Sequence, residues 1–205
     1  MGLRGVGDMV RVLILEDDII ISRDLVEIVE EIVEEVHLAS SYEEAMALLN
    51  QFSFDLCLSD INLNEEKTGI CFAKEIVKRS PNVELIYITA HYDEATIAKT
   101  EGTNPLNFIV KPYTEQQIKT TVNLAINKIK SQQNRFQELA KLTKQEQKIL
   151  LLITKNKSNK EIADDLFVSE KTVRNHRYNM LKKLEILQEK NALLFFGLKV
   201  FPPEN

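Results

Sequence analysis

The 205-residue sequence predicts a five-stranded, doubly wound parallel α/β domain followed by an all-α module of four helices. Short apolar segments typical of strands alternate with amphipathic helical patterns until about residue 130, where the strand signal ends. The charge changes sign at nearly the same place. Residues 1–134 carry 12 Lys and Arg against 22 Asp and Glu, a net charge of −10, whereas residues 135–205 carry 14 against 9, a net charge of +5.

Five short apolar segments are expected to form the strands. They are rich in Val, Ile and Leu, as is typical of parallel strands that are buried on both faces. They occupy residues 10–15, 36–40, 54–59, 83–89 and 107–110. Helices are expected after them at residues 18–33, 41–49, 69–79, 93–101 and 114 to at least 129. Ser41 with Glu44, and Thr114 with Gln117, have the spacing of capping boxes at two of these helices.

The second module has its own helix signals. Thr143 with Glu146, and Ser158 with Glu161, have capping-box spacing, and Ser169 is expected to cap a third helix. The apolar face of this third helix is formed by Val173, Met180, Leu181 and Leu184, and a fourth helix is expected at residues 189–200.

The expected division of the chain is a flexible leader at residues 1–9, the α/β domain at 10–130, a linker at 131–140 and the helical module at 141–205. Three of the six glycines lie in the leader, which favours flexibility. Residues 131–140 are polar, and a frayed extension of the preceding helix is the alternative to a linker.

The composition excludes several classes of protein. There is no run of eighteen apolar residues and no apolar signal segment, so we expect a cytoplasmic protein without membrane contact. Cys57 and Cys71 are expected to be reduced thiols. The basic second module indicates a polyanionic partner.

Polar side chains follow four of the predicted strands. Glu16 and Asp17 follow the first, Asp60 the third, Thr89 ends the fourth, and Lys111 follows the fifth. Because the carboxyl ends of parallel strands share one edge, we expect these groups to converge. Clustered carboxylates repel one another unless a cation lies among them, and their oxygens suit Mg²⁺. The sequence therefore predicts a magnesium-assisted phosphoryl-acceptor site with Asp60 as the acceptor.

These residues also carry a family resemblance. Residues 10–130 resemble the receiver domain of two-component response regulators, which implies a flavodoxin-like fold. The matching positions are Glu16-Asp17, Asp60 in Ser-Asp-Ile-Asn-Leu, Gly69-Ile70, Thr89-Ala90 and Phe108 before Lys111-Pro112. Asp18 stands at a variable position of the family and is expected only to favour the N-terminus of a helix.

The resemblance implies a metal-dependent transfer. Asp60 would accept a phosphoryl group from a phosphohistidine of a sensor histidine kinase. Asp17 would bind Mg²⁺ directly and Glu16 would do so through water. Asp60 and the backbone carbonyl of Asn62 would complete the protein's share of the metal ligands.

The resemblance also implies a switch. Lys111 would pair with Asp60 and then with the phosphoryl oxygens, while Thr89 would donate its hydroxyl to the phosphoryl group. Phe108 would be the aromatic side chain that changes rotamer in response. The peptide bond before Pro112 is often cis in this family.

The chain departs from the commonest receiver pattern after the acceptor. Many relatives carry Pro four residues after the acceptor and Gly eight residues after it. Here Asn64 holds the first position, and Gly69 lies nine residues after Asp60. The loop is therefore one residue longer and more polar, and it leaves the acceptor intact. His91, which follows Thr89-Ala90, is expected to be a solvated loop residue.

Residues 141–200 resemble the helix-turn-helix output domain of the LuxR/NarL type. The resemblance rests on the segments Leu-Thr-Lys-Gln-Glu (142–146), Ser-Asn-Lys-Glu-Ile-Ala (158–163) and Val-Ser-Glu-Lys-Thr-Val-Arg-Asn-His (168–176). The family's base-reading positions are Arg174, Asn175 and Tyr178. Phosphate contacts, which position a protein on DNA without specifying sequence, are expected from Lys160, Lys171, Thr172 and Lys182. Arg177 falls near the apolar side and is expected to pack.

The sequence thus predicts a response regulator and transcription factor, and not a metabolic enzyme. Phosphorylation of Asp60 is expected to control homodimer formation and binding to double-stranded DNA. One alternative is a DNA-binding regulator whose receiver is only a scaffold. Another is a magnesium-dependent phosphohydrolase, which the absence of an acidic residue at Asn62 disfavours.

Overall fold

The computed structural model describes residues 9–64, 66–90, 93–187 and 189–201. Of the expected leader only Met9 is among these residues, and His91 also lies outside them. The chain divides into two compact units, residues 1–129 and 130–205. No helix in the described part is long and apolar enough to cross a membrane.

The first unit contains a parallel sheet of five strands in the order β2-β1-β3-β4-β5. The strands are β1 (Arg11–Leu15), β2 (Glu35–Ala39), β3 (Leu56–Asp60), β4 (Glu84–Thr89) and β5 (Asn107–Val110). Every residue of β3 and β4 is buried, in agreement with their central positions. The order reverses direction between β1 and β3, and ligand sites of such sheets lie at this point.

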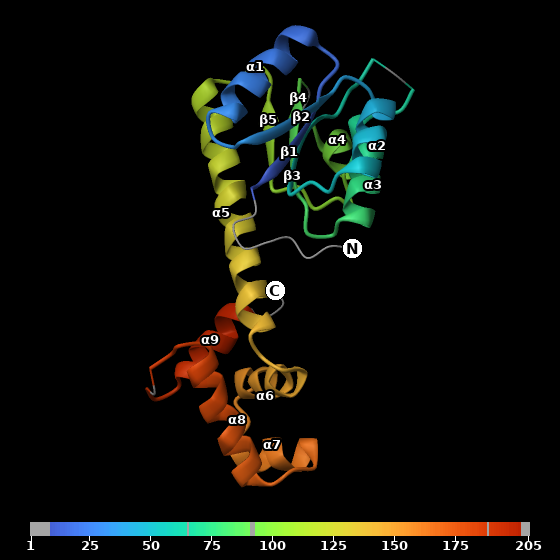
Figure 1. Ribbon diagram of the computed structural model, residues 1–205. Helices are drawn as coiled ribbons and strands as arrows, with labels where there is room; N and C mark the ends of the chain where they lie inside the picture. Colours follow the sequence, from blue (N-terminus) through green and yellow to red (C-terminus); the bar gives the residue numbers. More distant parts are fainter. Residues whose placement is uncertain (1–8, 65, 91–92, 188, 202–205) are drawn as a thin grey trace. The chain divides into compact units, whose positions relative to one another are not determined.

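Helices cover both faces of the sheet (Figure 1). They are α1 (Ile19–Glu30), α2 (Tyr42–Gln51), α3 (Gly69–Arg79), α4 (Glu94–Lys99) and α5 (Glu115–Ala140). One apolar core lies between the sheet and the face formed by α1 and α5, and a second lies beneath α2 and α3. The expected alternation of strands and helices is confirmed, and the predicted bounds of α3 and β5 match the observed ones.

The end of α1 differs from the prediction. The helix expected to reach residue 33 ends as α1 at Glu30, although the N–H of Val33 still donates to the carbonyl of Val29 at 3.0 Å. The apolar pattern continues beyond the helix because Val33 is buried in the core. Residues 131–140 belong to α5, so of the two alternatives for this segment the helix extension is the one that the structure shows.

The second unit contains α6 (Lys144–Thr154), α7 (Asn159–Leu166), α8 (Glu170–Lys183) and α9 (Ala192–Val200). Both expected capping boxes are present, at Thr143 and at Ser158, and Ser169 caps α8. The last helix begins at residue 192 and not at 189, after Asn191 in the left-handed region. The apolar core joins all four helices.

Candidate phosphoryl-acceptor and DNA-binding sites

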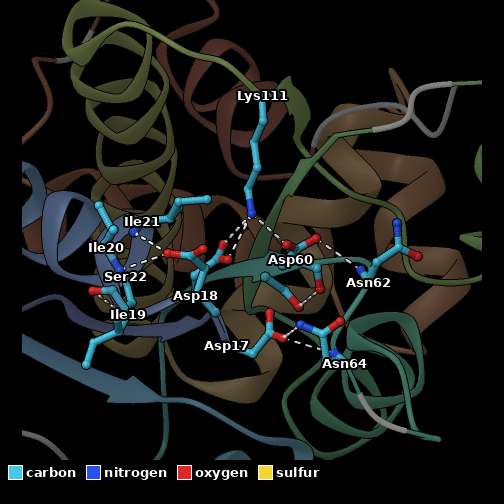
Figure 2. A network of polar contacts seen from close by, with 12 residues as sticks. Asp17, Asp18, Ile19, Ile20, Ile21, Ser22, Asp60, Asn62, Asn64 and Lys111 are labelled. Atoms are coloured by element: carbon cyan, nitrogen blue, oxygen red, sulfur yellow. Dashed lines mark hydrogen bonds and ion pairs between the residues drawn. The ribbon is translucent and has the colours of Figure 1, made fainter.

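The polar residues predicted at the strand ends gather at one edge of the sheet. Asp60 is the last residue of β3, and Glu16 follows β1 directly. Thr89 ends β4, next to β3 in the sheet, and Lys111 follows β5. Figure 2 shows Lys111 reaching across this edge toward Asp60, with Asp17 nearby.

Lys111 lies between two carboxylates. Its ammonium nitrogen, Nζ, is 2.6 Å from Asp60 Oδ2, and it is 2.9 and 2.7 Å from the two carboxylate oxygens of Glu16. The backbone N–H of Lys111 donates to the carbonyl of Thr89 at 2.8 Å, and this bond holds the start of the loop. The peptide bond between Lys111 and Pro112 is cis. The contact with Asp60 was expected, whereas the contact with Glu16 was not.

The environment perturbs the charges of this cluster. Burial raises the pKa of Glu16 to about 7, and the negative charge of Asp60 adds to this effect, while Lys111 opposes it. For Lys111, burial acts to lower the pKa, but hydrogen bonds to Asp60 and Glu16 outweigh it and raise the pKa above its ordinary value. Lys111 therefore stays protonated and neutralises part of the acidic cluster.

The acidic residues fit a small divalent cation. Glu16, Asp17 and Asp60 each offer one carboxylate oxygen, and these oxygens lie within 4.8 Å of one another. Two oxygens bound to the same Mg²⁺ can be at most about 4.2 Å apart, twice the length of its bonds. The donor set therefore suits Mg²⁺ with small adjustments or with one carboxylate binding through water. Asn62 lies beside this set, and its backbone N–H donates to Asp60 Oδ1 at 3.0 Å.

Asp18 lies apart from the acidic cluster and caps α1. Its Oδ1 accepts hydrogen bonds from the N–H groups of Ile20 and Ile21 at 2.8 and 3.0 Å. This local role agrees with the expectation for Asp18, and Figure 2 shows its carboxylate directed toward the first turn of the helix.

A stacked aromatic pair joins β4 to β5. Phe108 stacks on Tyr87, with ring centroids 5.4 Å apart and planes at 27°. The hydroxyl of Tyr87 donates to Thr103 Oγ1 at 3.2 Å, between α4 and β5. Sequence reasoning missed Tyr87. Strand periodicity could have found it, because Tyr87 lies two residues before Thr89 and therefore on the same face of β4.

Gly69 allows the chain to pass close to the end of β3. A Cβ atom at this position would lie 1.7 Å from the backbone oxygen of Asp60 and 2.5 Å from Ser59 Oγ. Its N–H donates to the carbonyl of Ile61 at 3.1 Å. The glycine is therefore required by space, and α3 begins directly against the end of β3.

The predicted DNA-binding residues lie on α8 and beside it. Val173, Met180 and Leu184 are buried, as predicted for the apolar face. Lys171, Arg174, Asn175, Tyr178 and Lys182 are exposed, as is Lys160 on α7, and Thr172 is half-buried.

Several of these side chains have partners within the unit. Arg174 Nη2 lies 3.8 Å from Glu170 Oε2, and Lys182 Nζ lies 4.7 Å from the centre of the Tyr178 ring. The hydroxyl of Thr172 is 2.8 Å from Ser169 Oγ, so it belongs to the cap of α8.

An ion pair between a buried carboxylate and an exposed lysine joins α6 to α8. Glu146 is 2% exposed, and its Oε2 accepts from Lys183 Nζ at 2.6 Å and from the N–H of Thr143 at 2.8 Å. Burial acts to raise the pKa of Glu146, but these two donors lower it below its ordinary value. The capping role was predicted, whereas the pairing with Lys183, 37 positions away, was not.

Two family matches cover most of the chain. Residues 12–123 match the response regulator receiver domain, and residues 140–196 match the luxR family of bacterial regulatory proteins. The chain is 28% identical over 204 residues to the transcriptional regulatory protein LiaR of Bacillus subtilis strain 168, covering 91% of this chain and 96% of LiaR. It is 26% identical over 193 residues to the response regulator protein TodT of Pseudomonas putida, covering 90% of this chain and 85% of TodT.

Solved structures show the same fold. A CheY-like receiver domain protein from Methanospirillum hungatei JF-1 matches 60% of this chain and 98% of its own length, with a TM-score of 0.56 at 22% identity. The response regulator StyR matches 92% of this chain and 98% of its own length, with a TM-score of 0.52 at 22% identity. The chain belongs to the response regulators and combines a receiver domain with a DNA-binding domain of the luxR family.

Proposed function

We propose that a sensor histidine kinase transfers a phosphoryl group to Asp60 and that this transfer controls sequence-specific DNA binding through α8. One observation carries the proposal: the ammonium of Lys111 lies 2.6 Å from the buried carboxylate of Asp60. Asp60 itself belongs to a cluster of three carboxylates. The receiver domain implies a kinase partner, and the luxR-family domain implies DNA.

The transfer is a displacement at phosphorus. A carboxylate oxygen of Asp60 forms a bond to phosphorus while the P–N bond to the kinase histidine breaks, and the imidazole nitrogen keeps the electron pair. A carboxylate is a weak nucleophile, so positioning and neutralised charge support this step more than a strong base. Lys111 supplies one positive charge beside the incoming oxygens.

The acidic cluster supports Mg²⁺ as the cofactor. Asp17 and Asp60 would bind it directly, Glu16 would bind it through water, and the backbone carbonyl of Asn62 would supply a further oxygen. When bound, the ion would neutralise the charge of the transferring oxygens. The oxygen-only donor set supports this choice over a transition metal.

A direct test uses a small phosphodonor. The wild-type chain, incubated with acetyl phosphate and Mg²⁺, is expected to gain one base-labile phosphoryl group, detected by intact-protein mass spectrometry. Addition of excess chelator should slow the labelling strongly. Equal labelling with and without Mg²⁺ would contradict a metal-assisted transfer, and no labelling under either condition would contradict the proposed function.

Thr89 and Phe108 would transmit a conformational change from phosphorylated Asp60 to the rest of the molecule. The new phosphoryl group adds about −1.5 to −2 of charge with strong acceptor oxygens, toward which the Thr89 hydroxyl would turn. Phe108 would then change position, and its stacking on Tyr87 would carry the change toward Thr103. Tyr87 lies in the core beneath α2 and α3, and the partly buried Phe108 packs against this core.

Thr89→Ala is expected to accept the phosphoryl group but to lose much of the response. In the wild type, phosphorylation should tighten DNA binding by roughly 5- to 150-fold, the usual range of allosteric coupling. The variant lacks the hydroxyl that senses the phosphoryl oxygens, so its gain should be much smaller. Labelling measures phosphoryl transfer, sedimentation measures dimer formation, and binding curves measure the affinity for DNA. Thr120→Ala, an exposed threonine on α5, is the matched control, and an equal gain in Thr89→Ala and wild type would contradict this route.

We also propose a homodimer of the phosphorylated chain and a division of labour on DNA. Apolar side chains cover α9 on several sides, and Phe195 and Leu198 are 66% and 40% exposed, which supports a contact between two copies. Arg174, Asn175 and Tyr178 would read bases. Lys160, Lys171, Thr172 and Lys182 would contact phosphates, as their exposure on and beside α8 allows.

Two alternatives receive less support. A scaffold receiver would not need the Lys111 contact with Asp60 or the acidic cluster around it. A phosphohydrolase would need a general acid two residues after the nucleophile, where this chain has Asn62. Stable labelling without turnover of small phosphomonoesters separates the proposal from both.

A further inference from the structure

Asn64 donates two hydrogen bonds to the proposed metal ligand Asp17. The backbone N–H of Asn64 donates to Asp17 Oδ2 at 3.0 Å, and the side-chain amide Nδ2 donates to the same oxygen. Figure 2 shows both bonds on one side of the Asp17 carboxylate. The two residues are 47 positions apart, so the contact joins the segment after β1 to the loop after β3.

The residues just before Asn64 are anchored in the core. Ile61 and Leu63 are buried in the core beneath α2 and α3, whereas Asn62 and Asn64 between and after them are exposed. Further along, Gly69 donates to the carbonyl of Ile61. The backbone that leads to Asn64 is thus held by the packing of Ile61 and Leu63 and by this hydrogen bond to Ile61.

The neighbouring carboxylates repel the carboxylate of Asp17. It is half-buried, and its carboxylate shares a small space with those of Glu16 and Asp60. Lys111 contacts Glu16 and Asp60. Repulsion between like charges would therefore favour rotation of Asp17 toward solvent, and two N–H donors on Oδ2 counteract this rotation.

We propose that Asn64 is a positioning residue for the metal site: it holds Asp17 by Oδ2 and leaves Oδ1 for the divalent cation. This inference rests on the proposed function. It assigns a role to the polar residue that stands where many receivers have proline. A proline at position 64 would lack both donors, since it has neither an amide side chain nor a backbone N–H.

Three variants distinguish the contributions of the backbone N–H and the side-chain amide of Asn64. Asn64→Ala removes the side-chain donor and keeps the backbone N–H, and Asn64→Pro removes both. Asn64→Asp keeps the size of the side chain but replaces its donor by a carboxylate that repels Asp17. Asn82→Ala, an exposed asparagine between α3 and β4, is the control.

Calorimetric titration of the unphosphorylated full-length proteins with Mg²⁺ gives the first measurement. Loss of a residue that orients a metal ligand commonly costs about 10- to 100-fold in metal affinity. We expect a loss in this range for Asn64→Pro and Asn64→Asp, a smaller loss for Asn64→Ala, and wild-type affinity for Asn82→Ala. Asn64→Ala and Asn64→Asp decide the matter if the proline variant does not fold.

Labelling by acetyl phosphate as a function of Mg²⁺ concentration gives the second measurement. A positioning role predicts that the variants need more Mg²⁺ for half-maximal rate but reach the wild-type rate at saturation. A low rate at saturating Mg²⁺ in Asn64→Ala would show a disturbed acceptor loop and overturn the proposal. Unchanged or tighter Mg²⁺ binding in Asn64→Ala and Asn64→Asp would overturn it as well. Failure of the wild type itself to bind Mg²⁺ would instead contradict the proposed function.

Discussion

Asp60→Asn is expected to abolish labelling by acetyl phosphate while the protein remains folded. An amide of the same shape replaces the carboxylate, so packing around this buried residue, which is 7% exposed, changes little. The amide lacks the nucleophilic oxygen anion that forms the bond to phosphorus. Lys111 keeps its contacts with both oxygens of Glu16, so its charge stays paired. Removal of one carboxylate also relieves repulsion within the cluster, and thermal stability without Mg²⁺ should not fall.

The matched control is Asp18→Asn. It makes the same substitution at the same edge of the sheet, but Asp18 caps α1, and asparagine caps helices as well as aspartate does. This control should label like the wild type. Intact-protein mass spectrometry, followed by base treatment to remove the acyl phosphate, measures both variants. Stoichiometric base-labile labelling of Asp60→Asn would show that another residue is the acceptor.

Substitutions on α8 are expected to separate base reading from phosphate contact. Arg174→Ala or Asn175→Ala should cost about 1–3 kcal/mol at the specific site and relax the preference at one base pair, because Arg pairs with guanine and Asn with adenine in the major groove. Arg174 is exposed, and its guanidinium lies 3.8 Å from the carboxylate of Glu170. Because exposed ion pairs contribute little stability, Arg174 can leave this contact for DNA at little cost.

Lysine variants should behave differently. Lys160→Ala or Lys182→Ala is expected to weaken binding to all sequences similarly and to reduce the slope of affinity against salt by roughly one unit. Binding curves on a selected site and on random DNA, at several salt concentrations, distinguish the two groups. A parallel loss on both DNAs in Arg174→Ala would refute base reading and indicate a different rotation of α8 in the groove.

The fold and the convergence of the acidic residues could be predicted because both follow from regular rules. Alternating strands and helices predict a parallel sheet, and the shared carboxyl edge predicts that Asp60 and Lys111 meet. The contacts that escaped prediction join residues through tertiary packing. Asn64 meets Asp17 across 47 positions and Lys183 meets Glu146 across 37, and no local pattern encodes these pairs.

Helix ends were predicted best where a capping residue marks them. Thr143, Ser158 and Ser169 cap the helices of the second unit as expected. The end of α1 and the start of α9 were misplaced because Val33 and Glu189 continue a plausible pattern without a glycine or proline to stop it. The need for glycine at position 69 also depends on a tertiary approach, since its neighbour is the backbone oxygen of Asp60.

The stacked pair of Tyr87 and Phe108 gives the chain an internal optical probe. The sequence contains no tryptophan, so tyrosine dominates its near-ultraviolet absorption and emission. Tyr87 is fully buried, and burial raises its pKa to about 12, so its hydroxyl stays protonated under ordinary buffer conditions. Any rearrangement of the ring beside it alters the asymmetric environment of this chromophore. Near-ultraviolet circular dichroism of the unlabelled chain, in which Tyr87 is one of five tyrosines, therefore includes a signal from this pair without an attached dye.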